Sequence, residues 1–322
     1  MFRAKTLPLR VVFMGTPQFA LPSFEATANS EEIIAVVTQP DRPSGRGMKL
    51  TPSPIKKAAL QKSIPIYQPE RIRKDVAFIK TLSDLAPDII VVVAFGQILP
   101  ASVLNIPPLG CINLHASLLP KYRGAAPIQW ALIRGEKTTG VASMKMDVGM
   151  DTGSILLQKE VAIGESEMAP EFSQRLSCIG ADLLVETIQQ IKSGQRMPTP
   201  QRTEGVTFAP LLKKEDGFIR WQESAEEIFN RWRGVFSWPG TTMFHGEERL
   251  KIVSLEIGAR EGKWGVPGVL LKISAKGLEV AAGIGYIIVI RLKLAGGKDI
   301  SSAEYAAGNH LLHGTNFYTK ET

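Results

Sequence analysis

The sequence predicts an α/β protein of two domains, a doubly wound Rossmann-like N-terminal domain and a smaller C-terminal β-barrel of the OB-like kind. Strongly apolar runs of strand length alternate with helical patterns as far as Gly194, which is typical of a sheet covered on both faces. Beyond residue 210 the pattern changes to short strand-like pieces broken by glycines. The length of 322 residues also exceeds the usual size of one domain.

The first domain is predicted from this alternation. LRVVFMG is typical of a buried strand that ends at Gly15-Thr16-Pro17. SPIKKAALQK indicates a helix with Ser53 as its N-cap and Pro54 in its first turn. Strands or short extended pieces are predicted over 9–15, 33–40, 64–68, 88–96, 110–115, 140–147 and 153–163. Helices are predicted over 53–62, 71–86, 125–133 and 169–194, with an amphipathic segment over 18–29.

The change of pattern places the domain boundaries. Residues 1–194 are predicted to form the catalytic domain, and 211–322 the C-terminal barrel. Residues 195–210 are rich in Pro, Thr and polar residues without a period, so they predict a linker or an extended strap. In the C-terminal domain a helix is expected over 224–235. Strand-like pieces are expected there over 241–257, 268–274, 277–283 and 286–297.

Composition excludes several classes of protein. No apolar run approaches the length that spans a bilayer, and the opening MFRAKTLPLRVVFMG is too brief and too quickly strand-like for a signal peptide. This opening contains three basic residues and no acidic one, so targeting to an organelle stays open as an alternative. Cys111 and Cys178 have neither metal-ligand nor redox spacing, so no metal is expected and a cytoplasmic location is predicted. Nothing such as a coiled-coil seam demands association, so a monomer is expected.

The charge is basic and unevenly distributed. The net charge of +7 favours a polyanionic partner such as nucleic acid. Between Arg42 and Lys62 six basic residues occur without an acid, whereas from Leu211 onward 15 basic residues face 13 acidic ones. An anion-binding surface is therefore expected on the first stretch, although a solvated loop is the commoner role of such a stretch.

Three polar residues form a candidate site. Asn113 and His115 lie two apart on a predicted strand, so both point to one face at its carboxyl end, where α/β sheets bind ligands. The turn MDVGMDTG then supplies Asp147 and Asp151, either of which could orient the imidazole and favour its charged form. An amide, an imidazolium and a carboxylate suit attack by a neutral amine on an acyl carbon. The alternative is that Asn113 and His115 form a hydrogen-bonded structural pair. Asp147 and Asp151 would then be turn residues.

Four motifs carry a resemblance to a known family. The Asn-x-His pair, SLLP (117–120), YRGAAPIQWA (122–131) and MDVGMDTG (146–153) together resemble the folate-dependent formyltransferases. The resemblance implies 10-formyltetrahydrofolate as the formyl donor, with Asn113, His115 and Asp151 as catalytic residues. The residues that it implies for folate binding are Ser117, Leu118, Leu119, Pro120, Val93, Phe95 and Gly96.

Further stretches resemble the members of this family that act on methionyl-tRNA. These stretches are 11–24, the basic loop TQPDRPSGRGMKLTPSPIK (38–56), 224–242 with RGVFSWPG, and 292–301, so the resemblance covers nearly the whole chain. It implies that the basic loop approaches the acceptor end of the initiator tRNA and that the C-terminal domain binds tRNA. Arg42, Arg46 and Lys49 are the residues expected to pair with phosphates. Asp299 departs from the pattern, since relatives often carry a second Lys there.

The predicted reaction is transfer of the formyl group to the α-amine of methionyl-tRNA, and three rivals stay open. The same chemistry could use a ribonucleotide that looks aminoacylated, an amino sugar or water as the acceptor, although such relatives resemble only about the first 200 residues. A nicotinamide-dependent oxidoreductase would share the fold, but Gly15-Thr16-Pro17 lacks the GxGxxG pattern. A non-enzymatic RNA-binding protein would explain the basic loop and leave the three polar residues unexplained.

Overall fold

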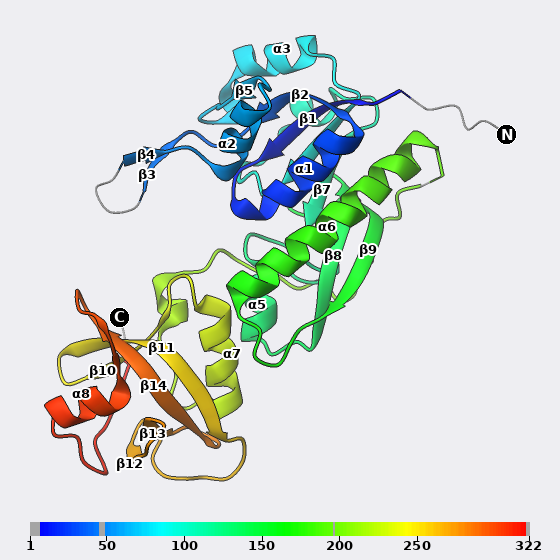
Figure 1. Ribbon diagram of the computed structural model, residues 1–322. Helices are drawn as coiled ribbons and strands as arrows, with labels where there is room; N and C mark the ends of the chain where they lie inside the picture. Colours follow the sequence, from blue (N-terminus) through cyan, green and yellow to red (C-terminus); the bar gives the residue numbers. More distant parts are fainter. Residues whose placement is uncertain (1–6, 45–48, 196, 320–322) are drawn as a thin grey trace. The chain divides into compact units, whose positions relative to one another are not determined.

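The computed structural model describes residues 7–44, 49–195 and 197–319. These residues form two compact units, an α/β unit and a β-rich unit, which Figure 1 draws in colours that follow the chain. The predicted fold class is confirmed. Among the described residues, the first unit consists of the chain as far as Pro127, Thr138–Ala162 and Ser173–Pro210. The second unit consists of Ile128–Lys137, Ile163–Phe172 and the chain from Leu211 onward.

A seven-stranded sheet forms the centre of the first unit, in the order β5-β2-β1-β6-β7-β8-β9. The strands from β5 to β7 are parallel and β8 and β9 run antiparallel, so a doubly wound sheet ends in an antiparallel pair. The apolar runs of β1 and β6 are buried, as sheets covered on both faces require. The bounds are β1 Arg10–Gly15, β2 Glu32–Val37, β5 Ile66–Tyr67, β6 Ile89–Val93, β7 Cys111–His115, β8 Thr138–Lys145 and β9 Ser154–Ala162.

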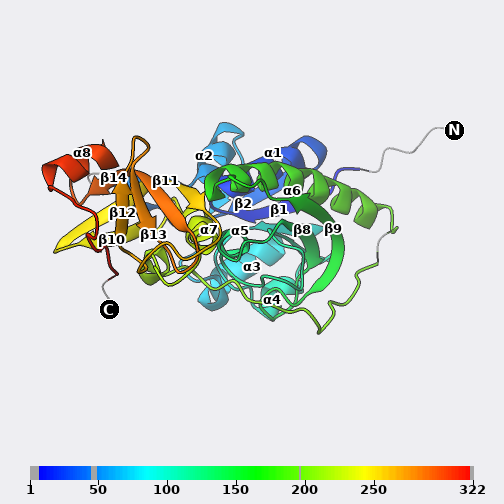
Figure 2. The same cartoon turned by 90° about the horizontal axis from the view of Figure 1, so that it is seen from below.

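Helices cover both faces of this sheet, with α1 and α6 on one side and α3 and α4 on the other (Figure 2). The hydroxyl of Ser53 accepts a hydrogen bond from the Lys56 N–H at 3.0 Å, which confirms the predicted N-cap. The helix bounds are α1 Leu21–Ser30, α2 Pro54–Gln61, α3 Val76–Asp84, α4 Ala101–Leu104, α5 Pro127–Ile133 and α6 Ala169–Lys192. Short 3₁₀ helices occupy η1 Gln18–Ala20 and η2 Ile72–Lys74.

Three predicted segments differ from the structure. The strand predicted to reach Gly96 ends at Val93, because Ala94 and Gly96 both take positive φ angles, of 48° and 83°. The helix predicted from residue 71 begins only at Val76, since the Asp75 side chain caps it there by accepting from the Phe78 N–H. The basic loop, predicted without structure, forms a hairpin of β3 Arg42–Ser44 and β4 Lys49–Thr51.

The second unit is an antiparallel sheet that the end of the described chain closes into a barrel. Its strand order is β10-β11-β14-β13-β12, with β15 beside β14. Residues 315–318 lie between β10 and β12, the two strands at the ends of this order. Phe244 of β10 exchanges backbone hydrogen bonds with Tyr318, and the Leu270 N–H of β12 donates to the Thr315 carbonyl. Closure removes the exposed strand edges of an open sheet.

The elements of the second unit follow the predicted pieces. Its strands are β10 Thr241–His245, β11 Glu248–Ala259, β12 Leu270–Ile273, β13 Leu278–Ala281, β14 Tyr286–Leu294 and β15 Asp299–Ser301. Its helices are η3 Lys214–Gly217, α7 Ala225–Val235 and α8 Ser302–Gly308. Ser224 and Glu227 form a capping box at the start of α7.

Phe317→Ala tests the closing segment. The Phe317 ring is 1% exposed and packs in the core of the second unit, so its loss should lower the free energy of unfolding by about 3–5 kcal/mol. All five tryptophans lie in the second unit, so denaturation followed by tryptophan fluorescence reports on this unit. Leu312→Ala is the control, because Leu312 is 73% exposed and should change the midpoint little. Equal midpoints for the two variants would contradict the role of residues 315–318.

Candidate active site

The site lies where β1, β6 and β7 end side by side. Gly15 at the end of β1 pairs with Val93, and Val92 pairs with Asn113 of β7, so the loops that follow these strands leave the same edge. Two of these loops are joined through the Phe95 carbonyl. It accepts from the Thr16 hydroxyl at 3.2 Å and from the Gln39 amide at 3.1 Å.

The end of β6 and the loop after it contain Val93, Phe95 and Gly96, which were predicted to bind folate. Val93 and Phe95 are 0% and 1% exposed, and Phe95 packs in the apolar core of the unit. Ala94, which lies between Val93 and Phe95, and Gly96, which follows Phe95, are exposed. This loop therefore presents Ala94 and Gly96 to solvent, with the two larger side chains beneath.

Asn113 and His115 share one face of β7. Leu114 faces the other way and packs against α6, where a Cβ on Gly180 would lie 2.7 Å from a Leu114 methyl. Asn113 is half-buried, and the side chain of His115 is 7% exposed. Burial raises the pKa of the Cys111 thiol, two residues before Asn113, to about 12. Cys111 is therefore a protonated thiol at neutral pH and no thiolate nucleophile.

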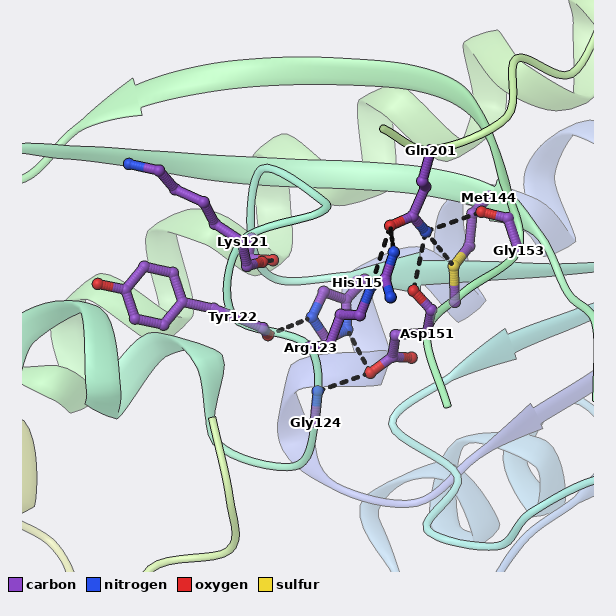
Figure 3. Close-up of polar contacts among 10 residues, drawn as sticks. His115, Lys121, Tyr122, Arg123, Gly124, Met144, Asp151, Gly153 and Gln201 are labelled. Carbon is purple, nitrogen blue, oxygen red and sulfur yellow. Dashed lines mark hydrogen bonds and ion pairs between the residues drawn. The ribbon is translucent and has the colours of Figure 1, made fainter. Parts of the chain in front are cut away.

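His115 lies between a carbonyl and a carboxylate (Figure 3). Its Nε2 is 2.9 Å from the Tyr122 carbonyl oxygen, and its Nδ1 is 3.7 Å from Oδ2 of Asp151. A carbonyl only accepts, so Nε2 must carry the proton and Nδ1 is the ring nitrogen that faces the acid. The structure thus brings two of the three predicted catalytic residues together, His115 from the end of β7 and Asp151 from the loop after β8.

The two aspartates of MDVGMDTG have different roles. Asp147 is a turn residue, since its Oδ1 accepts from the Gly149 N–H at 3.0 Å and from the Thr152 hydroxyl at 2.6 Å. Asp151 instead accepts the Gly124 N–H at 2.8 Å, from the loop after β7, and its side chain is 16% exposed. Its backbone is left-handed, with φ of 54°. Only Asp151 therefore reaches His115.

The SLLP segment forms the first part of the loop after β7. Ser117 is fully buried, and its hydroxyl donates to the Lys121 carbonyl at 2.6 Å. The Leu119 side chain is buried, and its carbonyl accepts from the Gln158 amide at 2.8 Å. Leu118 and Pro120 are half-buried. Of the four residues predicted to contact folate, these two expose the most side-chain surface.

Residues 197–210, part of the stretch predicted as a linker or an extended strap, fasten the site loops. The Gln201 amide receives hydrogen bonds from Arg123 and donates to the carbonyls of Asp151 and Gly153 (Figure 3). The Thr207 hydroxyl accepts the Tyr122 N–H at 2.8 Å. We call residues 197–210 the strap. Its aperiodic, polar composition resembles that of any linker, so a pattern could not have identified Gln201 or Thr207.

The basic hairpin is anchored at its base. Lys56 donates to Asp41 at 2.6 Å and to Gln68 at 2.7 Å, and Gln68 in turn donates to Asp41 at 2.9 Å. The hydrogen bonds from Lys56 and Gln68 lower the pKa of Asp41. Arg42 opens β3 and is exposed, and Lys49 opens β4. Arg46, the third residue expected to bind phosphate, lies outside the described residues.

Within the described residues, His, Cys, Asp and Glu nowhere gather in a group of three or more that could hold a metal ion. Over the same residues, every helix is too short or too polar to cross a membrane.

Comparison with known proteins identifies both parts of the chain. Residues 9–188 match the family model for formyl transferase, and residues 211–310 match that for the formyl transferase C-terminal domain. A methionyl-tRNA formyltransferase of Pelobacter propionicus is 47% identical over 306 residues, 95% of each chain. One of Thermodesulfovibrio yellowstonii is 47% identical over 310 residues, 96% of this chain and 99% of that protein.

Solved structures of low sequence identity share the fold. The sugar 3N-formyl transferase WlaRD, solved with dTDP and 5-N-formyl-THF, has a TM-score of 0.67 at 17% identity and covers 91% of this chain and 100% of its own. An N-formyltransferase from Helicobacter canadensis has a TM-score of 0.66 at 17% identity, with 87% of this chain and 98% of its own covered. On the family models and the sequence relatives, the chain belongs to the formyl transferase family and, within it, to the methionyl-tRNA formyltransferases.

Proposed function

We propose that the chain transfers a formyl group from 10-formyltetrahydrofolate to the α-amine of methionyl-tRNA, with the initiator tRNA as acceptor. One observation carries the proposal. The buried imidazole of His115 and the carboxylate of Asp151 lie 3.7 Å apart at the carboxyl edge of the sheet, with Asn113 on the same strand face. Proteins named methionyl-tRNA formyltransferase that align with 95% of this chain support the choice of acceptor.

The reaction needs an oxyanion stabiliser and a proton acceptor. The neutral amine attacks the formyl carbon, and the carbonyl electron pair moves to the oxygen. Asn113 donates its amide hydrogen to this oxyanion, and His115, as an imidazolium with protons on both ring nitrogens, donates from Nδ1. The Asp151 carboxylate takes a proton from the attacking nitrogen. The oxyanion then re-forms the carbonyl as the bond between the formyl carbon and N10 of the folate breaks. N10 takes up the proton held by Asp151, which restores the carboxylate, and the formylated product and tetrahydrofolate leave.

The folate is proposed to bind over the loops that follow β6 and β7. Ser117, Leu118, Leu119 and Pro120 form one side of this site. Val93, Phe95 and Gly96 form the other. The pairing of β6 with β7 supports this arrangement, because it brings the two loops to one edge of the sheet. Exposed Gly96 lets a planar ring approach the backbone, since it carries no side chain.

The tRNA is proposed to contact both parts of the chain. Arg42, Arg46 and Lys49 pair with phosphates near the acceptor end, and residues 211–322 form a tRNA-binding domain. Residues 1–194 form the catalytic domain and 195–210 the linker. The anchored base of the hairpin supports the role of Arg42, because it fixes where β3 leaves the domain. The protein acts as a monomer in the cytoplasm.

Product analysis tests the proposed function. The protein is incubated with 10-formyltetrahydrofolate and methionyl-tRNA, and the released amino acid is analysed for a formylated amine. Parallel reactions supply an amine-bearing ribonucleotide, an amino sugar nucleotide or water alone as the acceptor. Formylmethionine in the first reaction only is the expected result. Formyl transfer to another acceptor, without formylmethionine, would replace the proposed substrate.

Asn113→Ala tests the oxyanion donor. Loss of one such donor typically lowers the rate by about 100- to 1,000-fold, so the single-turnover rate of formyl transfer should fall by that much. Thermal unfolding should change little, because Asn113 is only half-buried. Asn29→Ala, at an exposed position of α1, is the matched control. A near-normal rate for Asn113→Ala would remove this residue from the mechanism.

Arg42→Ala tests the hairpin. The variant should bind tRNA more weakly, with a slope of log affinity against log salt reduced by about 0.9, the value for one lost phosphate contact on duplex nucleic acid. The dissociation constant for folate should stay unchanged, since Arg42 lies on the hairpin. Arg73→Ala removes an equally exposed cation from the same unit and serves as the control. Equal loss of folate and tRNA binding would contradict the assigned role.

A further inference from the structure

The side chain of Gln201 uses all its hydrogen-bonding capacity on two loops of the site. Its Oε1 accepts from Nε and Nη2 of Arg123, at 3.1 and 2.6 Å. Its Nε2 donates to the carbonyls of Asp151 and Gly153, each at 2.8 Å. An amide oxygen offers two lone pairs and an amide NH₂ two hydrogens, so all four are engaged. Glutamate could keep the Arg123 contacts but could not donate to the carbonyls.

These two loops hold the groups around His115. Tyr122, beside Arg123, supplies the carbonyl at 2.9 Å from Nε2 of His115. Gly124, on the other side of Arg123, donates its N–H to Asp151 Oδ2 at 2.8 Å. The segment 122–124 therefore orients both the imidazole and the carboxylate. Gln201 joins this segment to the backbone of Asp151 and Gly153.

The backbone of these loops needs such a fastening. Tyr122 and Asp151 both have left-handed backbones, with φ of 59° and 54°, a conformation that is unfavourable for a non-glycine residue. Such a conformation persists only where the surroundings fix it. The strap supplies that fixation at two points, through Thr207 to the Tyr122 N–H and through Gln201 to the Asp151 carbonyl.

We propose that Gln201 is a positioning residue for formyl transfer, which holds Asp151 against His115 by bridging Arg123 to the Asp151–Gly153 backbone. This inference rests on the proposed function. Gln201 touches neither the imidazole nor the carboxylate, so it acts through Asp151. A displacement of about 1 Å at a catalytic group can lower a rate about 100-fold.

The first test compares Gln201→Glu and Gln201→Ala with Gln190→Ala. Gln190 is a matched control, because its side-chain amide donates to Glu186 of the same helix, α6, at 2.9 Å. Gln201→Glu should lower kcat about 10- to 100-fold and change each KM less than about threefold, since binding surfaces are untouched. Gln190→Ala should match the wild type. A Gln201→Glu variant with wild-type kcat would overturn the proposal.

The second test asks whether Gln201 acts through Asp151. If it does, Asp151→Asn combined with Gln201→Glu should be no more than about threefold slower than Asp151→Asn alone, because residues that act as one unit are not additive. Independent effects would multiply, and a further 10- to 100-fold loss in the double variant would overturn the proposal.

A third measurement separates this inference from the proposed function. The chain has four histidines, so the ¹⁵N resonances of His115 can be assigned by substitution. Gln201→Glu should shift the His115 imidazole resonances and leave those of His245 unchanged. A wild-type protein without formyl transfer would refute the proposed function, whatever the spectra. Unshifted His115 resonances, in a wild-type enzyme that transfers formyl, would refute only the role of Gln201.

Discussion

The site depends on one hydrogen bond between two loops that leave the sheet from different strands. The Gly124 N–H, after β7, donates to the Asp151 carboxylate, after β8, and so turns that carboxylate toward Nδ1 of His115. The bond requires a glycine. Gly124 has φ of 125°, and a Cβ there would lie 2.5 Å from the Ala209 carbonyl oxygen. The close approach of the strap therefore decides which residue can stand at position 124.

The strap extends this constraint to the rest of the first unit. The Arg123 N–H donates to the Thr207 carbonyl, the Ala209 N–H donates to the Arg123 carbonyl, and Ile155 exchanges backbone hydrogen bonds with Thr199. The end of the strap thus contacts the loop after β7, and the beginning of the strap contacts the first residues of β9. These bonds satisfy backbone groups of a segment that forms no helix or strand, and they give the loops of the site a second support besides the sheet.

Sequence predicted the parts of this structure that depend on local patterns. The apolar runs of β1 and β6 and the cap at Ser53 follow from neighbours along the chain. Local turn chemistry also accounts for Asp147. It fails for Asp151, because the partner of this carboxylate lies 27 residues away. The closing segment 315–318 and the bridge through Gln201 were missed for the same reason, since both consist of long-range contacts in stretches without a period.

In the basic stretch, folding pairs some of the cations with acidic residues. The sequence alone gives only the number of charges. Among the described cations of this stretch, Lys56 is neutralised by Asp41 at 2.6 Å and Lys62 by Glu25 at 3.0 Å, both within the first unit. Lys56 holds the base of the hairpin, so its charge serves the fold. Arg42, Arg46 and Lys49 keep a local excess of positive charge in the sequence. Because exposed charges interact over roughly 8 Å at physiological salt, we expect cations placed so close together to attract a phosphate more strongly than the same net charge spread over the domain would.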